Sequence, residues 1–597
     1  MSETICHKFV GSKSRPSKKP AIIAARNRLW FEVTWSEYYE NAENLACGLS
    51  NLGIGPGDSV AIFSNTRFEW AVSDMAIMGL GAITVPIYQS STAEEVKFIL
   101  NNSEAKAIIC ETEALAEVYR KVADDCPTTK HLFVIDIKDP KGDEDSLENL
   151  MADGEDKAES EPKFFEDQCR QRKIDDIATI IYTSGTTGQP KGVVLTHKQI
   201  MSEVTDAFPL LGMSAKDRTL AFLPFAHILG RIEIWGHILI GYEMCYAESI
   251  ERIKFNIQSQ QPTVIIAVPR IFEKIYNGIL GQIEINPAKK KVFEWALGIG
   301  KQVSKSRENK KSIPLHIAVQ YRLAKKLVFN KIKEKMGGRL RFAMSGGAPL
   351  NKELAEFFSS IGILLLEGYG LTETTAAVCV NTTFDYKFGS VGKPIGDVRI
   401  KLDHDGEILV KSDKVMREYY KNESATKEVF TEDGYFRTGD IGVVDSDGYV
   451  IITDRKKDLI KTAGGKYVAP QKLEGLLKLN RFISQVHIHG DKRKYIVALL
   501  TLNEEAIRDY SKTENTNVSL NEAHESPEIK EIVRKSVAEV NAKLASFESI
   551  KNFAILPGDF SIETGELTPS LKVKRKVVDQ RYAEVIDGLY GLDRTSI

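Results

Sequence analysis

The stretch YTSGTTGQPKG, residues 182–192, combines glycines, aliphatic hydroxyls and one lysine in an order that suits a polyphosphate. Glycines let backbone N–H groups approach an anion closely, serine and threonine hydroxyls donate to phosphate oxygens, and Lys191 adds a point charge. A Walker-type loop instead ends in G-K-[ST] and opens a helix, whereas Lys191 lies between Pro190 and Gly192. A flexible surface turn is the alternative, but such a turn has no need of this ordered set.

Apolar runs flank the loop on both sides, IATIIY before Thr183 and GVVLT after Lys191. Short runs rich in β-branched residues predict buried strands. We therefore expect a loop that joins two strands, without the helix dipole of a Walker-type site.

Five further motifs follow along the chain: SGGAP (345–349), EGYGLTET (367–374), YFRTGD (435–440), DRKKDLIKTAGGKYVAP (454–470) and LTPSLKVKR (567–575). Together with the loop, and in this order, they resemble the adenylate-forming superfamily of acyl-CoA synthetases, luciferases and peptide synthetase adenylation domains. The resemblance covers nearly the whole chain. Within the superfamily, VPRIFEKIY (268–276) and KTAGGKYVAP (461–470) are most similar to the long-chain acyl-CoA synthetase branch.

The resemblance implies ATP, Mg²⁺ and coenzyme A, with a medium- to long-chain fatty acid as the substrate. A carboxylate attacks the α-phosphorus of ATP and expels pyrophosphate, and a thiol then opens the acyl adenylate. A fatty acyl-AMP ligase or an acyl carrier protein synthetase shares the first step and is the alternative. A lipid- or nucleotide-binding homologue without activity is a more distant one, since Lys191, Glu373, Asp440 and Lys572 are all present.

The nucleotide site follows from the same resemblance. Glu373 would bind Mg²⁺ together with Thr183, because Mg²⁺ is usually held by one or two carboxylates and by phosphate oxygens. Asp440 would accept both ribose hydroxyls, with Arg455 also at the ribose. The alternatives are a solvated glutamate at a helix start and a turn-capping aspartate. The other ATP and AMP contacts would come from Ser184, Gly185, Thr186, Thr187, Gly188, Lys191, Gly346, Gly347, Ala348, Glu367, Gly368, Tyr369, Gly370, Leu371 and Thr372.

The C-terminal motifs imply a mobile lid that serves two half-reactions. Lys572 would bridge the carboxylate and the α-phosphate, although Leu571 stands where the family has glycine and Lys574 is a second candidate. Asp454 is at the hinge position. After rotation, the face that accepts the thiol would include Lys461, Gly464 and Gly465.

The acyl side of the site is expected in FLPFAHILGRIEIWGHILIG, residues 222–241, which in related synthetases borders the acyl pocket. His227 is the polar residue of interest there, with a substrate-contacting or gating role. The alternative is a core histidine that has one satisfied ring nitrogen.

The pattern of the chain around these residues predicts an α/β fold. From residue 20 to about 200, apolar runs alternate with helix-like stretches, and a second such unit extends to about 380. Asp-Gly turns then predict a small β-rich subdomain over about 385–453. We place an N-terminal domain at 1–453 and a C-terminal α+β lid domain at 454–597. The acidic segment 142–162 is expected to be a solvated loop or short helix.

Composition limits the class of protein. The 597 residues are 43% apolar and 27% charged with a net charge of −2, which argues against a disordered chain and against nucleic-acid binding. Seven scattered cysteines without a C-x-x-C pair favour a reduced compartment. The apolar stretch 71–88 contains Asp74 and Pro86, so it is not expected to span a membrane. A cytoplasmic protein without an obligate protein partner is expected.

Residues 289–335 are strongly basic, and apolar residues are interleaved with the charges. Such a surface could contact anionic lipid at the cytoplasmic face of a membrane. The alternative is a solvated helical face. The basic residues are Lys289, Lys290, Lys291, Lys301, Lys305, Arg307, Lys310, Lys311, Arg322, Lys325, Lys326, Lys331, Lys333 and Lys335.

Overall fold

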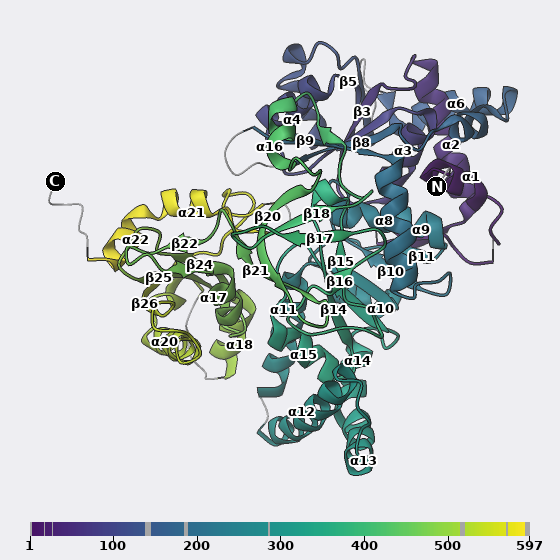
Figure 1. Cartoon of the computed structure of the whole chain (residues 1–597). Helices are drawn as coiled ribbons and strands as arrows, with labels where there is room; N and C mark the ends of the chain where they lie inside the picture. Colours follow the sequence, from purple (N-terminus) through teal and green to yellow (C-terminus); the bar gives the residue numbers. More distant parts are fainter. Residues whose placement is uncertain are drawn as a thin grey trace, which may run out of the picture.

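The computed structural model describes residues 3–16, 18–26, 28–137, 145–183, 189–284, 287–513, 520–568 and 571–591. Ser184, Gly185, Thr186, Thr187 and Gly188, which were predicted to bind phosphate, lie outside the described residues. Figure 1 shows a large lobe and, from α17 onward, a smaller lobe beside it.

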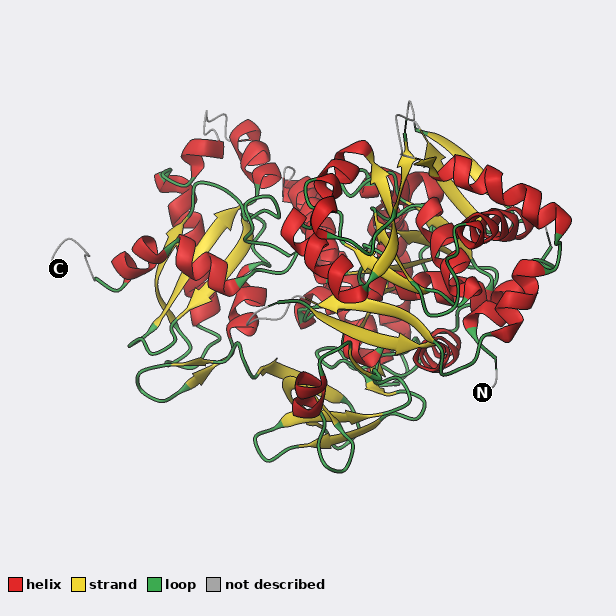
Figure 2. Ribbon diagram, turned by 90° about the horizontal axis from the view of Figure 1, so that it is seen from above, coloured by secondary structure: helices red, strands yellow, loops and turns green. Residues whose placement is uncertain are grey.

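Two large sheets form the centre of the large lobe, with helices around them (Figure 2). The first has the order β19 (Glu418–Tyr419), β9 (Lys191–Thr196), β8 (Ile177–Thr183), β4 (Ile83–Ile87), β3 (Ser59–Phe63), β5 (Ala105–Thr112), β6 (His131–Asp136) and β7 (Asp145–Ser146). The second has the order β16 (Lys393–Pro394), β15 (Cys379–Val380), β14 (Leu364–Tyr369), β13 (Phe342–Ser345), β12 (Val264–Ala267), β10 (Arg218–Ala221), β11 (Glu243–Tyr246), β1 (Ile22–Arg26) and β2 (Leu29–Val33). The predicted α/β class is confirmed.

The helices of the large lobe connect the parallel strands. They are α1 (Ile5–Ser12), α2 (Trp35–Asn51), α3 (Phe68–Leu80), α4 (Ala93–Ser103), α5 (Glu113–Arg120), α6 (Leu147–Ser160), α7 (Phe164–Gln171), α8 (His197–Leu210), α9 (Ile228–Ile240), α10 (Ile253–Gln260), α11 (Pro269–Glu284), α12 (Pro287–Glu308), α13 (Leu315–Ala324), the π-helical turn η2 (Lys325–Phe329), α14 (Asn330–Lys335) and α15 (Lys352–Ser360). Among the described helices, none is both long and apolar enough to cross a bilayer. The stretch 71–88 instead forms most of α3 and all of β4.

Two local expectations were wrong. Residues 20–200 do not form one contiguous unit, because β1 pairs in parallel with β11 of the second sheet, with Ile22 opposite Met244. The acidic segment is mostly a long helix, α6, which buries Leu147 and Leu150 and packs on α2. Most of its charged side chains are exposed, but Lys157 Nζ donates to Ser50 Oγ of α2 at 2.9 Å. The helix is longer and more buried than the solvated loop or short helix that the composition suggested.

The β-rich part and the small lobe follow. The four-stranded sheet has the order β17 (Arg399–Leu402), β18 (Glu407–Lys411), β20 (Phe436–Val444) and β21 (Val450–Arg455), with α16 (Glu423–Val429) nearby. Its hairpins turn at Asp405-Gly406 and Asp447-Gly448, as predicted. The small lobe contains β22 (Ile460–Lys461), β23 (Tyr467–Val468), α17 (Pro470–Leu477), β24 (Ile483–His489), β25 (Ile496–Leu502), α18 (Glu504–Thr513), α19 (Leu520–Ala523), α20 (Pro527–Asn541), β26 (Ile550–Ile555), α21 (Arg575–Arg581) and α22 (Ala583–Leu589).

A buried ion pair joins two helices, α3 and α9, in the core of the large lobe. Arg231 of α9 and Asp74 of α3 are both fully buried and in contact. Thr84 of β4 donates to the same carboxylate at 2.8 Å. The Arg231 guanidinium also lies 5.3 Å from the ring centroid of Trp70 and 5.0 Å from that of Trp235. Arg231 also donates to the buried Thr179 hydroxyl. Because the main compensation of each buried charge is its partner, removal of one partner leaves a buried charge.

We predict that Arg231→Met lowers the free energy of unfolding, measured by urea denaturation, by about 3–5 kcal/mol. The double variant Arg231→Met with Asp74→Leu should recover most of that loss, since a buried pair can be replaced by apolar side chains. Lys427→Met breaks an exposed pair with Glu423 and should change stability by less than about 0.5 kcal/mol. A loss below about 1 kcal/mol for Arg231→Met would contradict the expectation.

Candidate functional site

The glycine-rich loop joins two antiparallel strands, as its flanks predicted. Strands β8 and β9 pair along their length, with Thr183 opposite Lys191 at the end where the loop joins them. Strand β8 is parallel to β4, so the loop lies at the carboxyl ends of the parallel strands. That edge is where open α/β sheets bind ligands. The hairpin therefore holds the hydroxyl of Thr183 and the ammonium of Lys191 at one place.

Glu373 is brought to this hairpin by Tyr419. The Tyr419 hydroxyl donates to Glu373 Oε1 at 2.8 Å, and Lys191 Nζ lies 5.0 Å from the centre of the Tyr419 ring. Tyr419 is in β19, which pairs with β9. The predicted pair of Lys191 and Glu373 thus occupies one site through a tyrosine that the sequence motifs did not identify.

The backbone after Glu373 is strained and is held by buried groups. Thr375 and Ala376 adopt φ angles of 53° and 81°, in the region that disfavours residues other than glycine. Glu203 of α8 accepts the Ala377 N–H at 2.9 Å, and the Thr375 hydroxyl donates to the carbonyl of Lys414 at 2.7 Å. These contacts fix the position of Glu373.

Glu203 is fully buried in α8. Burial raises the pKa of its carboxyl to about 8, against the opposing effects of the Lys414 cation and the Ala377 N–H. The Lys414 side chain is itself fully buried and pairs with Asp206. A neutral Glu203 at physiological pH is therefore part of the support for the Glu373 loop.

Asp440 is the residue that the resemblance assigns to the ribose. It is 3% exposed, accepts a hydrogen bond from the Tyr369 hydroxyl at 2.7 Å, and accepts another from Arg455 Nε at 2.9 Å. The pairing of β20 with β21 places Asp440 directly opposite Arg455. Each carboxylate oxygen thus faces a donor, and the structure brings Asp440, Tyr369 and Arg455 together.

Two glycines among the predicted ATP and AMP contacts are needed for different physical reasons. Gly347 follows β13 with a φ of 77° and borders an open cavity. Gly370 is required by packing, because a Cβ there would lie 1.3 Å from the Ala376 carbonyl oxygen. Gly346, Ala348, Gly368, Leu371 and Thr372 lie in the same two segments, with Thr372 buried in the short helix η3 (Thr372–Thr374).

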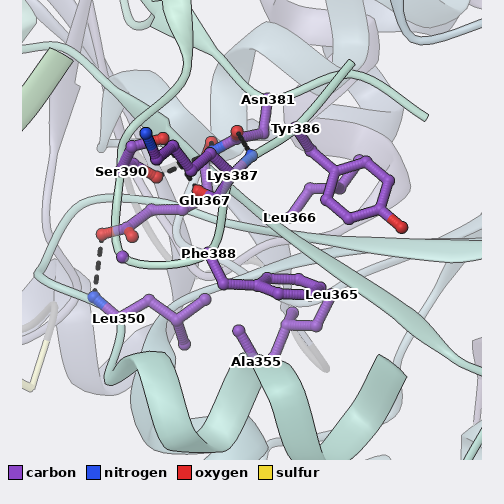
Figure 3. Close-up of a pocket in the computed structure, with 11 residues that line it drawn as sticks. Leu350, Ala355, Leu365, Leu366, Glu367, Asn381, Tyr386, Lys387, Phe388 and Ser390 are labelled. Carbon is purple, nitrogen blue, oxygen red and sulfur yellow. Dashed lines mark hydrogen bonds between the residues drawn. The ribbon is translucent and has the colours of Figure 1, made fainter. Parts of the chain in front are cut away.

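The Glu367 carboxylate points into a second, smaller cavity of about 220 Å³ (Figure 3). It accepts the Leu350 N–H at 2.8 Å, and burial raises its pKa to about 8. Asn381 Nδ2 donates to the Glu367 carbonyl at 3.1 Å. The side chain therefore supports the SGGAP loop from the side of this second cavity.

Lys572 reaches from the small lobe into a cavity of the large lobe, which together with its opening to solvent encloses about 530 Å³. Burial, and then the Arg455 cation, lowers the pKa of Lys572 to about 8, with opposing effects of Asp440 and Asp458. Most of the cavity wall is apolar, and it is formed by Phe222, Leu223, Pro224, His227, Leu229, Ile250, Val268, Ile271, Gly347, Leu571 and Lys572. Asp440 and the cavity thus lie on either side of one ammonium group.

Lys574, the other candidate for the catalytic lysine, begins a helix of the small lobe. Lys574 is the N-cap of α21, and its N–H donates to the Glu566 carbonyl at 2.7 Å. Leu571 adopts a φ of 61°, a left-handed conformation that costs about 1–2 kcal/mol in residues other than glycine. The backbone at Leu571 therefore has the form that the family's glycine would favour.

His227 caps α9 and lines the same cavity. Burial lowers its pKa to about 3, and the Lys572 cation adds to the shift, so the ring is neutral at physiological pH. Its Nδ1 accepts the Leu229 N–H at 3.1 Å. The proton of the neutral ring is then on Nε2, and the residue has both a structural bond and a free donor position.

Asp454 lies near the end of β21, the last strand of the β-rich sheet before the small lobe begins. It is 4% exposed, and burial raises its pKa to about 6. Lys461, Gly464 and Gly465 lie on an exposed hairpin, where the Lys461 N–H donates to Asp491 at 3.2 Å. Among the described residues, their contacts are with other residues of the small lobe, so this orientation does not bring them to Lys191 and Glu373.

The donors around Glu373 suit Mg²⁺. The Glu373 carboxylate is half-buried, and the hydroxyl of Thr183, which lies opposite Lys191 on the hairpin, is also a hard oxygen ligand. Mg²⁺ prefers such oxygens and keeps much of its water. Glu373 Oε1 already accepts a hydrogen bond from Tyr419, which leaves Oε2 as the oxygen for an ion.

The motifs missed Tyr419 and Glu203. Glu203 had a signal in the sequence, since it falls on the apolar stripe of Ile200, Val204 and Ala207 at helical spacing. A charged residue on a buried stripe is expected to have a buried partner. Tyr419 had no such signal, because its role depends on the long-range pairing of β19 with β9.

Comparisons with known proteins cover almost the whole chain. Residues 11–420 match the AMP-binding enzyme family, and residues 457–593 match the AMP-binding enzyme C-terminal domain. A long-chain-fatty-acid–CoA ligase of Mycobacterium bovis, FadD15, is 37% identical over 94% of this chain and 93% of its own. The peroxisomal long chain acyl-CoA synthetase 7 of Arabidopsis thaliana is 32% identical over 94% of this chain and 82% of its own length.

Solved structures share the fold. The adenylation domain of a carboxylate reductase from Mycobacterium chelonae has a TM-score of 0.74 at 23% identity, covering 98% of this chain and 91% of that one. The anthranilate CoA ligase AuaEII has a TM-score of 0.74 at 18% identity and covers 98% of both chains.

We predict that Glu203→Gln makes thermal stability less dependent on pH. In the unfolded chain this carboxyl loses its proton near its ordinary pKa of 4.5, but the folded protein keeps it to about 8. The stabilisation that comes from the protonated Glu203 carboxyl is therefore fully present below pH 4.5 and is lost as the pH rises through about 8. The slope removed by the variant is at most about 1.4 kcal/mol per pH unit.

Melting temperatures measured between these two pH values test this expectation. Glu203→Ala also removes the acceptor for the Ala377 N–H, so it should be less stable than the wild type at each pH. Parallel curves for the wild type and Glu203→Gln would show that Glu203 does not titrate as expected.

Proposed function

The chain belongs to the AMP-binding enzyme family, and we propose that it joins a medium- to long-chain fatty acid to coenzyme A, with ATP cleaved to AMP and pyrophosphate. The cavity of about 530 Å³ carries this proposal, because it places an apolar wall beside the ammonium of Lys572. Relatives that match most of the chain at 37% and 32% identity are named as long-chain acyl-CoA ligases or synthetases, which supports the substrate class.

In the first half-reaction, an oxygen of the fatty acid carboxylate forms a bond to the α-phosphorus as the bond to pyrophosphate breaks. Thr183, Lys191 and the loop between them would hold the leaving phosphates, and Asp440 with Arg455 would hold the ribose. Protonated Lys572 would contact both the carboxylate and the α-phosphate. Bound Mg²⁺, held by Glu373 and Thr183, would neutralise charge on the phosphate oxygens. The protein's contribution is alignment and electrostatic stabilisation.

In the second half-reaction, the thiol sulfur attacks the carbonyl carbon of the acyl adenylate. A C–S bond forms, AMP leaves with the electrons of the broken C–O bond, and the thiol proton is released. For this step the small lobe would turn at Asp454, withdrawing Lys572 and presenting Lys461, Gly464 and Gly465 to the thiol. Their exposed position in the present orientation is consistent with a surface used only after rotation.

We also propose that residues 289–335 contact the anionic surface of a membrane at its cytoplasmic side. Helices α12 and α13 project from the large lobe (Figure 1). Their exposed apolar side chains occur among the basic residues, with Leu315 81% exposed and Val319 57% exposed. Leu323 and Leu327 continue the same spacing of four residues. Apolar insertion with surrounding Lys and Arg is the pattern of an interfacial helix.

We predict that the purified protein, supplied with Mg²⁺, ATP, coenzyme A and a series of acids from acetate to octadecanoate, forms acyl-CoA and releases pyrophosphate. The value of kcat/KM should be highest for medium- to long-chain acids, because the cavity is apolar. Mass spectrometry separates the outcomes: acyl-AMP without acyl-CoA would favour an acyl-AMP ligase or transfer to a carrier protein. A preference for acetate or an aryl acid would contradict the proposal.

Lys572→Gln tests the catalytic assignment in the same assay. It should lower pyrophosphate release by about 100-fold or more, as for the loss of one preorganised donor. Lys574→Gln is the matched variant, and the reverse ranking would assign the role to Lys574. Because the pKa of Lys572 is lowered to about 8, kcat/KM should fall as pH rises through that value.

We predict that vesicles with anionic lipid co-sediment the protein more than neutral vesicles, and that added salt weakens binding. Replacing Leu315, Val319 and Leu323 by serine should reduce binding by about 10-fold, because apolar insertion is lost. The matched control is Leu29→Ser, which changes an exposed leucine elsewhere. Binding that does not depend on anionic lipid would contradict the membrane proposal.

A further inference from the structure

Leu571 combines a left-handed backbone with a place beside the reacting groups. Its φ is 61°, a conformation that glycine adopts freely and a leucine does not. It directly precedes Lys572, and both residues line the apolar cavity. A strained residue retained at such a place indicates that its side chain has a use there.

The side chain contributes an apolar surface from the small lobe. Leu571 is half-buried and packs beside the cluster of Leu499, Leu556 and Phe560 in that lobe. The other residues of the cavity wall, apart from Lys572, come from the large lobe. Leu571 therefore completes the cavity only when the small lobe is docked in this orientation.

We propose that Leu571 is a specificity-determining residue that closes the carboxylate end of the acyl cavity and selects acids unbranched at the carbon next to the carboxylate. This inference rests on the proposed function, in which the Lys572 ammonium contacts the carboxylate. The side chain that precedes Lys572 then lies beside the first carbons of the acyl group. A straight chain passes such a wall, whereas a branch at the first carbon competes with the leucine for the same space.

Leu571 is expected to select between straight and branched acids only in the first half-reaction. If the small lobe rotates after the adenylate forms, Leu571 leaves the cavity together with Lys572. Selection by Leu571 should therefore act on adenylate formation and be absent from the transfer of a supplied acyl adenylate to coenzyme A. A residue that only packs within the small lobe would affect straight and branched acids equally.

The test compares dodecanoic acid with its α-methyl derivative in acid-dependent pyrophosphate release, using the full-length protein. The wild type should prefer the straight acid, and Leu571→Gly should reduce the ratio of the two kcat/KM values by about 10-fold, the effect of one methyl group against an apolar wall. Leu571→Ala should reduce it less, and Leu571→Met should retain it. Transfer from supplied acyl adenylates should keep its ratio in each variant.

Gln261→Gly is the matched control, because Gln261 is exposed and also has a positive φ, of 49°. It should leave the ratio unchanged. If Leu571→Gly changes kcat/KM equally for both acids, the ratio stays the same and the proposal is overturned. If Leu571→Gly does not fold, Leu571→Ala and Leu571→Met decide by the same ratio. Failure of the wild type to release pyrophosphate with any acid would instead reject the proposed function.

Discussion

The docking of the small lobe on the large one is the constraint on which the site depends, because only this contact places Lys572 in the cavity. Among described residues, the polar contacts across the junction include Arg270 with Ser484, and Asn351 with the Gly475 carbonyl at 3.2 Å. An exposed ion pair between Lys543 and Glu353 at 3.1 Å also crosses the junction. The ammonium of Lys572 is also partly desolvated, as its lowered pKa shows. An anionic substrate beside it would relieve that cost, and binding and docking would then favour each other.

Two of the places where described residues other than glycine adopt positive φ adjoin groups proposed to react. Thr375 and Ala376 follow Glu373, and Leu571 precedes Lys572, all with positive φ. Elsewhere, positive φ at residues such as Glu104 and Gln261 occurs at helix ends, where it is ordinary. Strain of this kind persists only where surrounding contacts fix it. Glu203 and Lys414 provide those contacts for the first place, and the apolar cluster of the small lobe provides them for the second.

The local parts of this arrangement could be predicted from the sequence, and the long-range parts could not. The strand-loop-strand form of residues 177–196 followed from two apolar runs, and the turn at Asp447-Gly448 followed from its residue types. The place of β1 beside β11 could not be predicted, because nothing local specifies a partner about 220 residues away. The direction of the Glu367 side chain was equally inaccessible. Alternation along a strand defines two faces, but only the packed fold shows which one borders the ligand.

Asp454 connects these observations to the change of lobe orientation. Its Oδ2 is buried and has no hydrogen-bond partner among the described residues, while Oδ1 accepts the Arg455 N–H. A buried carboxylate with an unsatisfied oxygen disfavours the present orientation, whereas the lobe contacts and an anion beside Lys572 favour it. In the proposed reaction, adenylate formation converts the carboxylate beside Lys572 into a neutral acyl group, and one negative charge is lost there. The balance at Asp454 would then shift toward rotation, so completion of the first half-reaction would itself favour the second.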